Sequence, residues 1–237
     1  MTPGVQIPLT AAIAAIAGAP APVALLDTSV LLDVIRAPER SDSRTIPAAL
    51  RLLNAATARP RGIWTVVTTL VVEEWSENVD TLVAAALNHI RHVDNKRAPL
   101  DAALRFFDPA HAVAPSYESR DLPRHLRALS AALLDQSLVV QLDDALELRA
   151  LGRHRANRPP SARGRNEVDD CSILEHYLEL CRVLKGAAYD PSIIFLSSNK
   201  TDYCDSGTAL HTDLMPEFQQ AQLEFGRELT EVWRYIP

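Results

Sequence analysis

Four short apolar runs alternate with helical patterns along this chain, and this alternation restricts its fold more than any other feature. The runs are rich in β-branched residues, are bounded by turn-forming residues and lie at 22–27, 62–68, 137–142 and 192–197. Such continuous apolar runs are typical of strands that are buried on both faces. Strands that alternate with helices predict a parallel sheet covered on both sides, and therefore an α/β sandwich.

Three apolar stripes at spacings of three and four residues predict helices between and after these strands. They comprise Val79, Leu82, Val83, Ala86, Leu87 and Ile90; Ile173, Leu174, Tyr177, Leu178 and Cys181; and Phe218, Ala221, Phe225, Leu229 and Val232. The third stripe predicts one helix that closes the chain. Because no internal repeat divides the sequence, we expect a single domain with helical insertions over 21–237, preceded by an N-terminal extension at 1–20.

Composition excludes several function classes. The 24 basic and 30 acidic residues give a net charge of −6, so no global positive field would hold the protein on nucleic acid. Three cysteines without a CxxC pair predict neither a disulfide framework nor a zinc ribbon, and they favour a reducing compartment. The apolar stretch at 9–26 is interrupted by Gly18, Pro20 and Pro22, and no secretory signal precedes it. We therefore expect a cytoplasmic protein that does not contact membranes.

Acidic residues follow the first two predicted strands. Asp27 ends the first strand immediately before a helix start, where an acid is also typical of a helix N-cap. Glu74 follows the second strand on the predicted buried side of its helix, whereas Glu73 points about 100° away. A carboxylate on a buried face requires a partner or a metal ion.

Two later segments add further acids. Asp170 is in helical register with Ile173 and Tyr177 and so faces inward, whereas Asp169 does not, although an acid also suits a helix N-terminus. The fourth strand leads into a polar turn that contains Asn199 and Asp202, which an ordinary loop would also explain. Together, these carboxylates would repel one another unless a divalent cation neutralised them. This pattern predicts a carboxylate site for Mg²⁺ or Mn²⁺.

The four segments LLDTSVLLD, VVTTLVVEEW, NEVDDCSILE and IIFLSSNKTDY, spread over 23–203, resemble the ordered motifs of PIN-domain nucleases, particularly the larger bacterial PIN-like proteins. The resemblance implies a three-layer α/β/α fold with a central parallel sheet and metal-dependent cleavage of RNA. It also implies that Asp27, Glu74 and Asp170 bind the metal, with Asp202 or Asn199 at the fourth position. The toxins of this family are shorter, and the extra length here includes 79–93 and 101–125.

An arginine-rich segment at 149–165 holds six arginines and no acid. Arginine offers paired donors to phosphate, and this segment leads directly into the predicted metal ligand Asp170. A solvated loop is the alternative, because prolines and glycine also occur there. The expected substrate contacts are Arg153, Arg155, Arg158, Arg163 and Arg165.

These features predict a divalent-metal-dependent endoribonuclease in which metal-activated water hydrolyses phosphodiester bonds. Thr28, Ser29 and Ser197 are expected to orient the metal ligands through hydrogen bonds. RNA is the expected partner, with DNA as the alternative substrate and a second copy or a cognate regulatory protein as further partners. The rival hypothesis is a catalytically silent PIN-like module that binds RNA or a protein through the arginine-rich segment, and the amide at Asn199 keeps it open.

Overall fold

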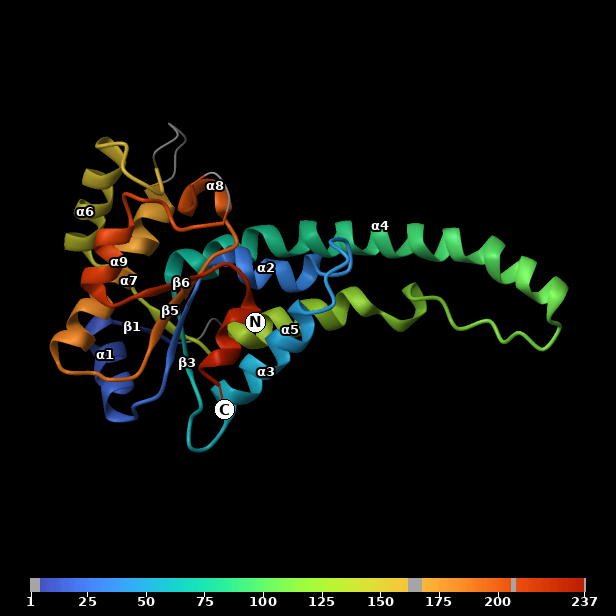
Figure 1. The fold of residues 1–237 in the computed structure, drawn as a ribbon, viewed down its shortest axis with the longest axis horizontal. Coiled ribbons are helices and arrows are strands. Elements are labelled where there is room, and N and C mark those ends of the chain that lie inside the picture. Colours follow the sequence, from blue (N-terminus) through green and yellow to red (C-terminus); the bar gives the residue numbers. More distant parts are fainter. Residues whose placement is uncertain (1–4, 162–167, 206–207, 237) are drawn as a thin grey trace.

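A central parallel sheet organises this protein, as a computed structural model of residues 5–161, 168–205 and 208–236 shows (Figure 1). Within these residues, six strands pair in the order β1-β4-β3-β2-β5-β6, and every pair is parallel. The strands are β1 (Gln6–Ile7), β2 (Val23–Leu26), β3 (Trp64–Thr68), β4 (Leu138–Val140), β5 (Ile193–Leu196) and β6 (Glu224–Gly226). The four strands expected from the apolar runs are confirmed as β2 to β5.

The strand order changes direction at β2. The chain proceeds from β2 to β3 and β4 on one side, and β5 and β6 lie on the other side. Val23 of β2 is in register with Trp64 of β3 and with Ile193 of β5, and every residue of these three strands is buried. In an open parallel sheet, such a change of direction leaves a crevice beyond the carboxyl ends of the two diverging strands. Here this crevice lies between β2 and β5.

Helices cover both faces of the sheet and complete the three-layer α/β/α fold (Figure 1). The helices α2 (Thr28–Arg36), α3 (Thr45–Thr57), α4 (Thr69–Phe107), α5 (Leu122–Asp135) and η2 (Leu229–Arg234) pack against one another on one face. The helices α1 (Leu9–Gly18), α6 (Asp144–Arg155), α7 (Val168–Gly186) and α9 (Met215–Ala221) form the other layer. In the described ranges, no helix has both the length and the apolar character needed to cross a bilayer.

The expectation of one helix at the end of the chain is wrong. Its apolar stripe is divided among α9, β6 and η2, which all face the core. Gln222 adopts a left-handed conformation with φ of 49°, which ends α9. The next residues then extend to pair with β5, in the register Phe195 to Phe225. A three-residue strand is too short to show an alternating pattern.

Residues 5–20 belong to the sheet and its helical layer. Strand β1 pairs with β4 in the register Ile7 to Val140, and α1 packs against α7. The described part of the expected N-terminal extension is therefore integrated into the fold. The boundaries of the domain remain a prediction.

Helix α4 extends far beyond the body of the protein (Figure 1). Its 39 residues span about 58 Å at 1.5 Å per residue. Its buried residues end at Ile90, whereas Phe106 and Phe107 near its far end are 90% and 87% exposed. The chain returns beside it through η1 (Glu118–Arg120) and α5. Much of the extra length expected at 79–93 and 101–125 thus forms this arm.

Candidate active site

Asp27 lies at the carboxyl end of β2, beside the crevice. It is the N-cap of α2, and its Oδ1 accepts a hydrogen bond from the Thr28 backbone N–H at 2.9 Å. Its Oδ2 accepts hydrogen bonds from the hydroxyls of Ser29 and Ser197, both at 2.6 Å. The residue is only 3% exposed, and burial raises the pKa of its carboxyl although these hydrogen bonds oppose the rise. In the described part of the chain, no basic side chain forms an ion pair with it.

Glu74 extends from the first turns of α4 toward the same site. The Thr28 hydroxyl donates a hydrogen bond to Glu74 Oε2 at 2.5 Å, so Thr28 connects the two acids. The residue as a whole is exposed, which corrects the expectation that it lies on the buried side of the helix. Desolvation of its carboxyl raises its pKa, and the nearby negative charges of Asp27 and Asp169 raise it further.

The first turn of α7 brings two acids near the same site. Asp170 is half-buried, and its backbone carbonyl accepts a hydrogen bond from the Tyr203 hydroxyl at 3.4 Å. Burial raises the pKa of Tyr203, and the negative charges of Asp170 and Asp27 add to the rise. Asp169 is exposed, as the helical register predicted, yet it is close enough to raise the pKa of Glu74. Both acids of this pair therefore border the site.

The exit of β5 supplies the fourth acidic segment. The Asn199 backbone N–H donates to the Ser197 hydroxyl oxygen at 3.2 Å, and the Asn199 side-chain amide donates to Asp202 Oδ2 at 2.5 Å. Asp202 belongs to the short helix α8 (Lys200–Tyr203). Its Oδ1 is buried and has no hydrogen-bond partner among the residues that the structure describes. Asn199 thus holds Asp202 rather than replacing it.

The chemistry of these residues fits a hard divalent cation. The donors at the crevice are carboxylate and hydroxyl oxygens, which Mg²⁺ and Mn²⁺ prefer. A buried carboxylate without a cationic partner and the unpartnered Asp202 Oδ1 are both groups that a cation would satisfy. As the described side chains stand, however, no group of three or more His, Cys, Asp or Glu residues could hold an ion.

The arginine-rich segment has a different structure from the expected one. Arg149, Arg153 and Arg155 belong to α6, and Arg153 is only 4% exposed. The Arg153 guanidinium donates to Glu175 Oε1 at 2.8 and 2.5 Å, to the Pro159 carbonyl at 2.9 Å and to Glu217. The expectation that Arg153 contacts phosphate is therefore wrong, because carboxylates of the protein already surround it.

The other arginines of this set differ from one another. Arg158 is exposed but forms an ion pair with Glu217. Arg155, in the last turn of α6, is exposed and has no ion-pair partner in the described residues. Arg163 and Arg165 lie outside the described residues. Arg155 thus remains the best-placed candidate of the set for a phosphate contact.

Two basic residues near the acids were missed by the sequence analysis. Lys200 follows Asn199, and Arg227 follows β6, so both lie where strands leave the sheet. Lys200 lies within a segment that was considered only for its acids. Arg227 could not be placed, because the segment around it was expected to be helical. A prediction that included β6 as a strand would have placed Arg227 at this edge of the sheet.

Comparison with protein families supports the motif resemblance. A model of the PIN domain matches residues 25–203, which is most of this chain. Comparisons with curated proteins and with solved structures find no match. The matched range begins two residues before Asp27, ends at Tyr203 and includes Glu74, Asp170 and Asp202. It therefore contains all four acidic segments of the site.

Proposed function

Since this chain belongs to the PIN-domain family, we propose that it is a divalent-metal-dependent endoribonuclease. The observation that carries this proposal is Asp27, a buried carboxylate at the topological switch point that only hydroxyl and amide donors contact. A buried charge without an opposite charge lowers the stability of a protein, so the presence of such a carboxylate favours a functional role.

Asp27, Glu74, Asp170 and Asp202 are the residues that would hold Mg²⁺ or Mn²⁺. When bound, the ion would lower the pKa of a water molecule and neutralise charge on the scissile phosphate. Thr28 and Ser29 would keep the carboxylates of Glu74 and Asp27 oriented through the hydrogen bonds described above. Ions shared by three of the acids would require their side chains to turn toward one another.

Ser197 connects the two halves of this site. Its hydroxyl donates to Asp27 and accepts from the Asn199 backbone N–H, while Asn199 holds Asp202. A chain of hydrogen bonds thus links the acid at the end of β2 to the acid after β5. We expect this chain to fix the distance between the two acids, which positions them for one substrate phosphate.

The rival hypothesis of a silent binding module has less support. Its binding surface was to be the arginine-rich segment, but Arg153 and Arg158 are bound to Glu217. The amide of Asn199, which had favoured this rival, donates to Asp202 and leaves the acid in place. Both observations favour the nuclease.

The test is incubation with single-stranded and structured RNA, and with the same sequences as DNA, in Mg²⁺, in Mn²⁺ or in EDTA. We expect RNA cleavage in metal, no cleavage in EDTA, and products that carry 5′-phosphates. Asp27→Asn should abolish the cleavage, while Glu73→Gln, a change of an exposed neighbouring acid on α4, should retain it. Cleavage that survives both EDTA and Asp27→Asn would contradict the proposal, as would a folded, metal-bound protein that cuts no RNA.

Metal binding provides a second readout that does not depend on activity. Mn²⁺ should raise the melting temperature of the parent protein, because a ligand that binds only the folded state stabilises it. The same ion should leave the melting temperature of Asp27→Asn almost unchanged. An equal increase in both proteins would place the metal elsewhere.

A further inference from the structure

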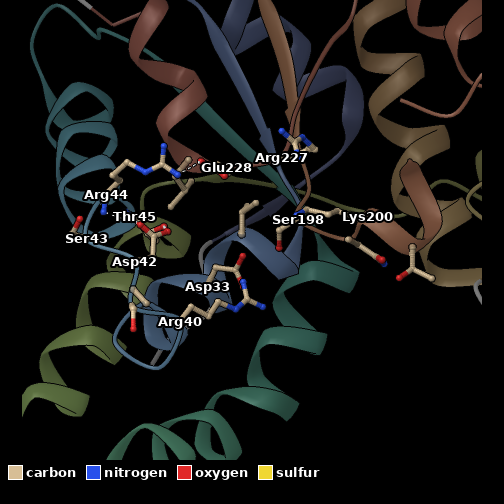
Figure 2. A pocket seen from close by; sticks show the side chains of 16 residues that line it. Asp33, Arg40, Asp42, Ser43, Arg44, Thr45, Ser198, Lys200, Arg227 and Glu228 are labelled. Atoms are coloured by element: carbon tan, nitrogen blue, oxygen red, sulfur yellow. Dashed lines mark hydrogen bonds and ion pairs between the residues drawn. The ribbon is translucent and has the colours of Figure 1, made fainter. Parts of the chain in front are cut away.

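A cavity of about 680 Å³ opens next to the acids, at the carboxyl edge of the sheet (Figure 2). Its walls come from α2 and the turn that follows it, from residues 198–201 after β5, and from residues 227–229 after β6. Asn199 lines the cavity and also holds Asp202, so the cavity and the acidic site share a wall. The volume is within the usual range for pockets that bind small ligands.

Seven of the 16 residues that line this cavity are charged. Its basic residues are Arg40, Arg44, Lys200 and Arg227, and its acidic residues are Asp33, Asp42 and Glu228. The cavity therefore has one more positive than negative charge, although the whole chain has a net charge of −6. Such a local excess favours an anionic ligand.

All three acidic residues are engaged within the protein. Asp33 forms an ion pair with Arg40 at 2.7 Å, and Glu228 forms one with Arg44 at 3.2 Å. Asp42 accepts hydrogen bonds from the Thr45 hydroxyl at 2.6 Å and from backbone N–H groups at the start of α3, which lower its pKa. These contacts hold the far walls of the cavity together.

Lys200 and Arg227 lack such partners. Among the described residues, no carboxylate lies within ion-pairing distance of either side chain. Figure 2 shows both near Ser198, whereas Arg40 and Arg44 lie beside carboxylates. Both positive charges also act on the Cys204 thiol, where they oppose the rise in pKa that burial causes. Both residues therefore line the cavity without a carboxylate partner among the described residues.

The backbone fixes Arg227 beside the acidic site. The Ser197 backbone N–H donates to the Gly226 carbonyl at 3.0 Å, and Ser197 in turn donates to Asp27. A Cβ at Gly226 would lie 2.6 Å from Leu196 Cδ2, so a larger residue there would have to displace the Leu196 side chain. The Arg227 backbone N–H then donates to Glu231 Oε1 at 2.6 Å. Arg227 thus leaves the sheet immediately next to Ser197.

We propose that this cavity binds a phosphodiester adjacent to the one that is cut, through Lys200 and Arg227. The inference rests on the proposed nuclease function and identifies where the substrate backbone enters the site. Arginine matches phosphate with paired donors and lysine adds a compact positive charge. A polyanion that approaches four acids needs nearby cations, and these two residues supply them on the wall that the cavity shares with the acids.

The experiment compares a Lys200→Gln/Arg227→Gln double variant with a control that loses the same charge outside the cavity, Lys96→Gln/Arg124→Gln. Lys96 and Arg124 are both exposed. The probe is a short labelled single-stranded RNA, with DNA of the same sequence as a second arm, in Ca²⁺ over a series of salt concentrations. Ca²⁺ takes the same oxygen ligands as Mg²⁺.

We expect the double variant to bind RNA at least about tenfold more weakly than the control pair, as for the loss of one charged hydrogen bond. The slope of log affinity against log salt should decrease by about 1.4, or about 0.7 for each phosphate contact. Equal losses with RNA and DNA would support recognition of the phosphate alone. A loss confined to RNA would support the same contact within a site that also recognises the ribose.

The inference is wrong if the double variant retains the affinity and slope of the control pair while the parent protein binds and cuts RNA. If the parent neither binds nor cuts RNA or DNA, the nuclease proposal itself fails, and this inference fails with it. Should Arg227→Gln prevent folding, the exposed Lys200→Gln alone should still reduce the slope by about 0.7. An unchanged slope in that variant would also contradict the inference.

Discussion

Two clusters of buried charge in this protein have opposite electrostatic balance. On the flank formed by α6, α7 and α9, the Arg153 guanidinium contacts two carboxylates, those of Glu175 and Glu217. At the edge of the sheet, the Asp27 carboxylate contacts only hydroxyl groups and one backbone N–H. The first cluster pairs its positive charge within the protein, whereas no cationic side chain among the described residues pairs with Asp27 in the second.

From this difference we infer that the first cluster is structural and the second is functional. The flank connects α6 to the next helix, α7, and to the more distant α9, so its ion pairs link the three helices. At the edge, burial raises the pKa of Asp27, and burial together with the negative charge of Asp27 raises the pKa of Glu74, so the ionised acids are disfavoured there. The density of arginines in the sequence was a poor guide to which basic residues could bind a substrate. The arginine-rich segment is partly neutralised by carboxylates, whereas the few basic residues near the edge of the sheet are not.

The largest expected effect tests which acid of α7 contributes to the acidic site at the edge of the sheet. Asp170→Asn should reduce cleavage by at least about 100-fold, since even residues that only support metal ligands are worth 10- to 100-fold. Asp169→Asn, the matched control one residue earlier, should reduce it far less, because Asp169 is the exposed member of the pair. Initial cleavage rates in Mn²⁺ measure both. A reversed order would assign the ligand to Asp169, which borders Glu74.

Removal of a charge from the flank formed by α6, α7 and α9 should lower the stability of the fold. Arg153→Ala would leave Glu175 buried without its main partner, and we expect a loss of about 3 kcal/mol in the free energy of unfolding. Urea denaturation measures this loss, and Arg155→Ala, two residues later on the same helix, is the exposed control. RNA affinity of the folded Arg153→Ala fraction should equal that of the parent. Weaker RNA binding with unchanged stability would instead support the original expectation that Arg153 contacts the substrate.

Asp27 should make a distinct contribution to the pH dependence of stability. The folded-state pKa of Asp27 is raised above its ordinary value of 3.8. Between these two pKa values, Asp27 therefore binds more protons in the folded protein than in the unfolded chain. In EDTA, the contribution of Asp27 to stability should therefore decrease as the pH rises from about 4 toward the raised pKa, by up to about 1.4 kcal/mol per pH unit. Melting temperatures across this range measure the decrease.

Two controls isolate the source of this pH dependence. Asp27→Asn should flatten the curve, because the amide does not titrate. Saturating Mg²⁺ should also oppose the decrease in the parent, because the cation favours the ionised carboxylates. Stability curves of the parent and of Asp27→Asn that run parallel over this pH range in EDTA would show that Asp27 carries no raised pKa.

The smallest expected effect concerns Arg155, the arginine of the flank without an ion-pair partner among the described residues. If it contacts the substrate backbone, Arg155→Ala should reduce the salt slope of RNA binding by about 0.7. Fluorescence titrations at several salt concentrations measure the slope. An unchanged slope would confine substrate recognition to the edge of the sheet and would make the contrast between the two clusters complete.

Local patterns in the sequence determined much of this architecture. The apolar runs predicted the four central strands, because strands buried on both faces must be apolar throughout. The position of Asp27 followed from the end of its strand, and the motif resemblance placed all four acidic segments within the range that the PIN domain matches. These inferences depend on neighbours in the sequence, which a pattern records directly.

Only the tertiary structure decided which charges remain available. Arg153 and Arg155 are two residues apart on one helix, so they point in different directions, and the partner Glu217 of Arg153 lies 64 residues further along the chain. Arg227 reached the edge through the three-residue strand β6, which has no detectable period. The balance of charge at a site depends on contacts between distant segments, and packing of the helices and strands sets those contacts.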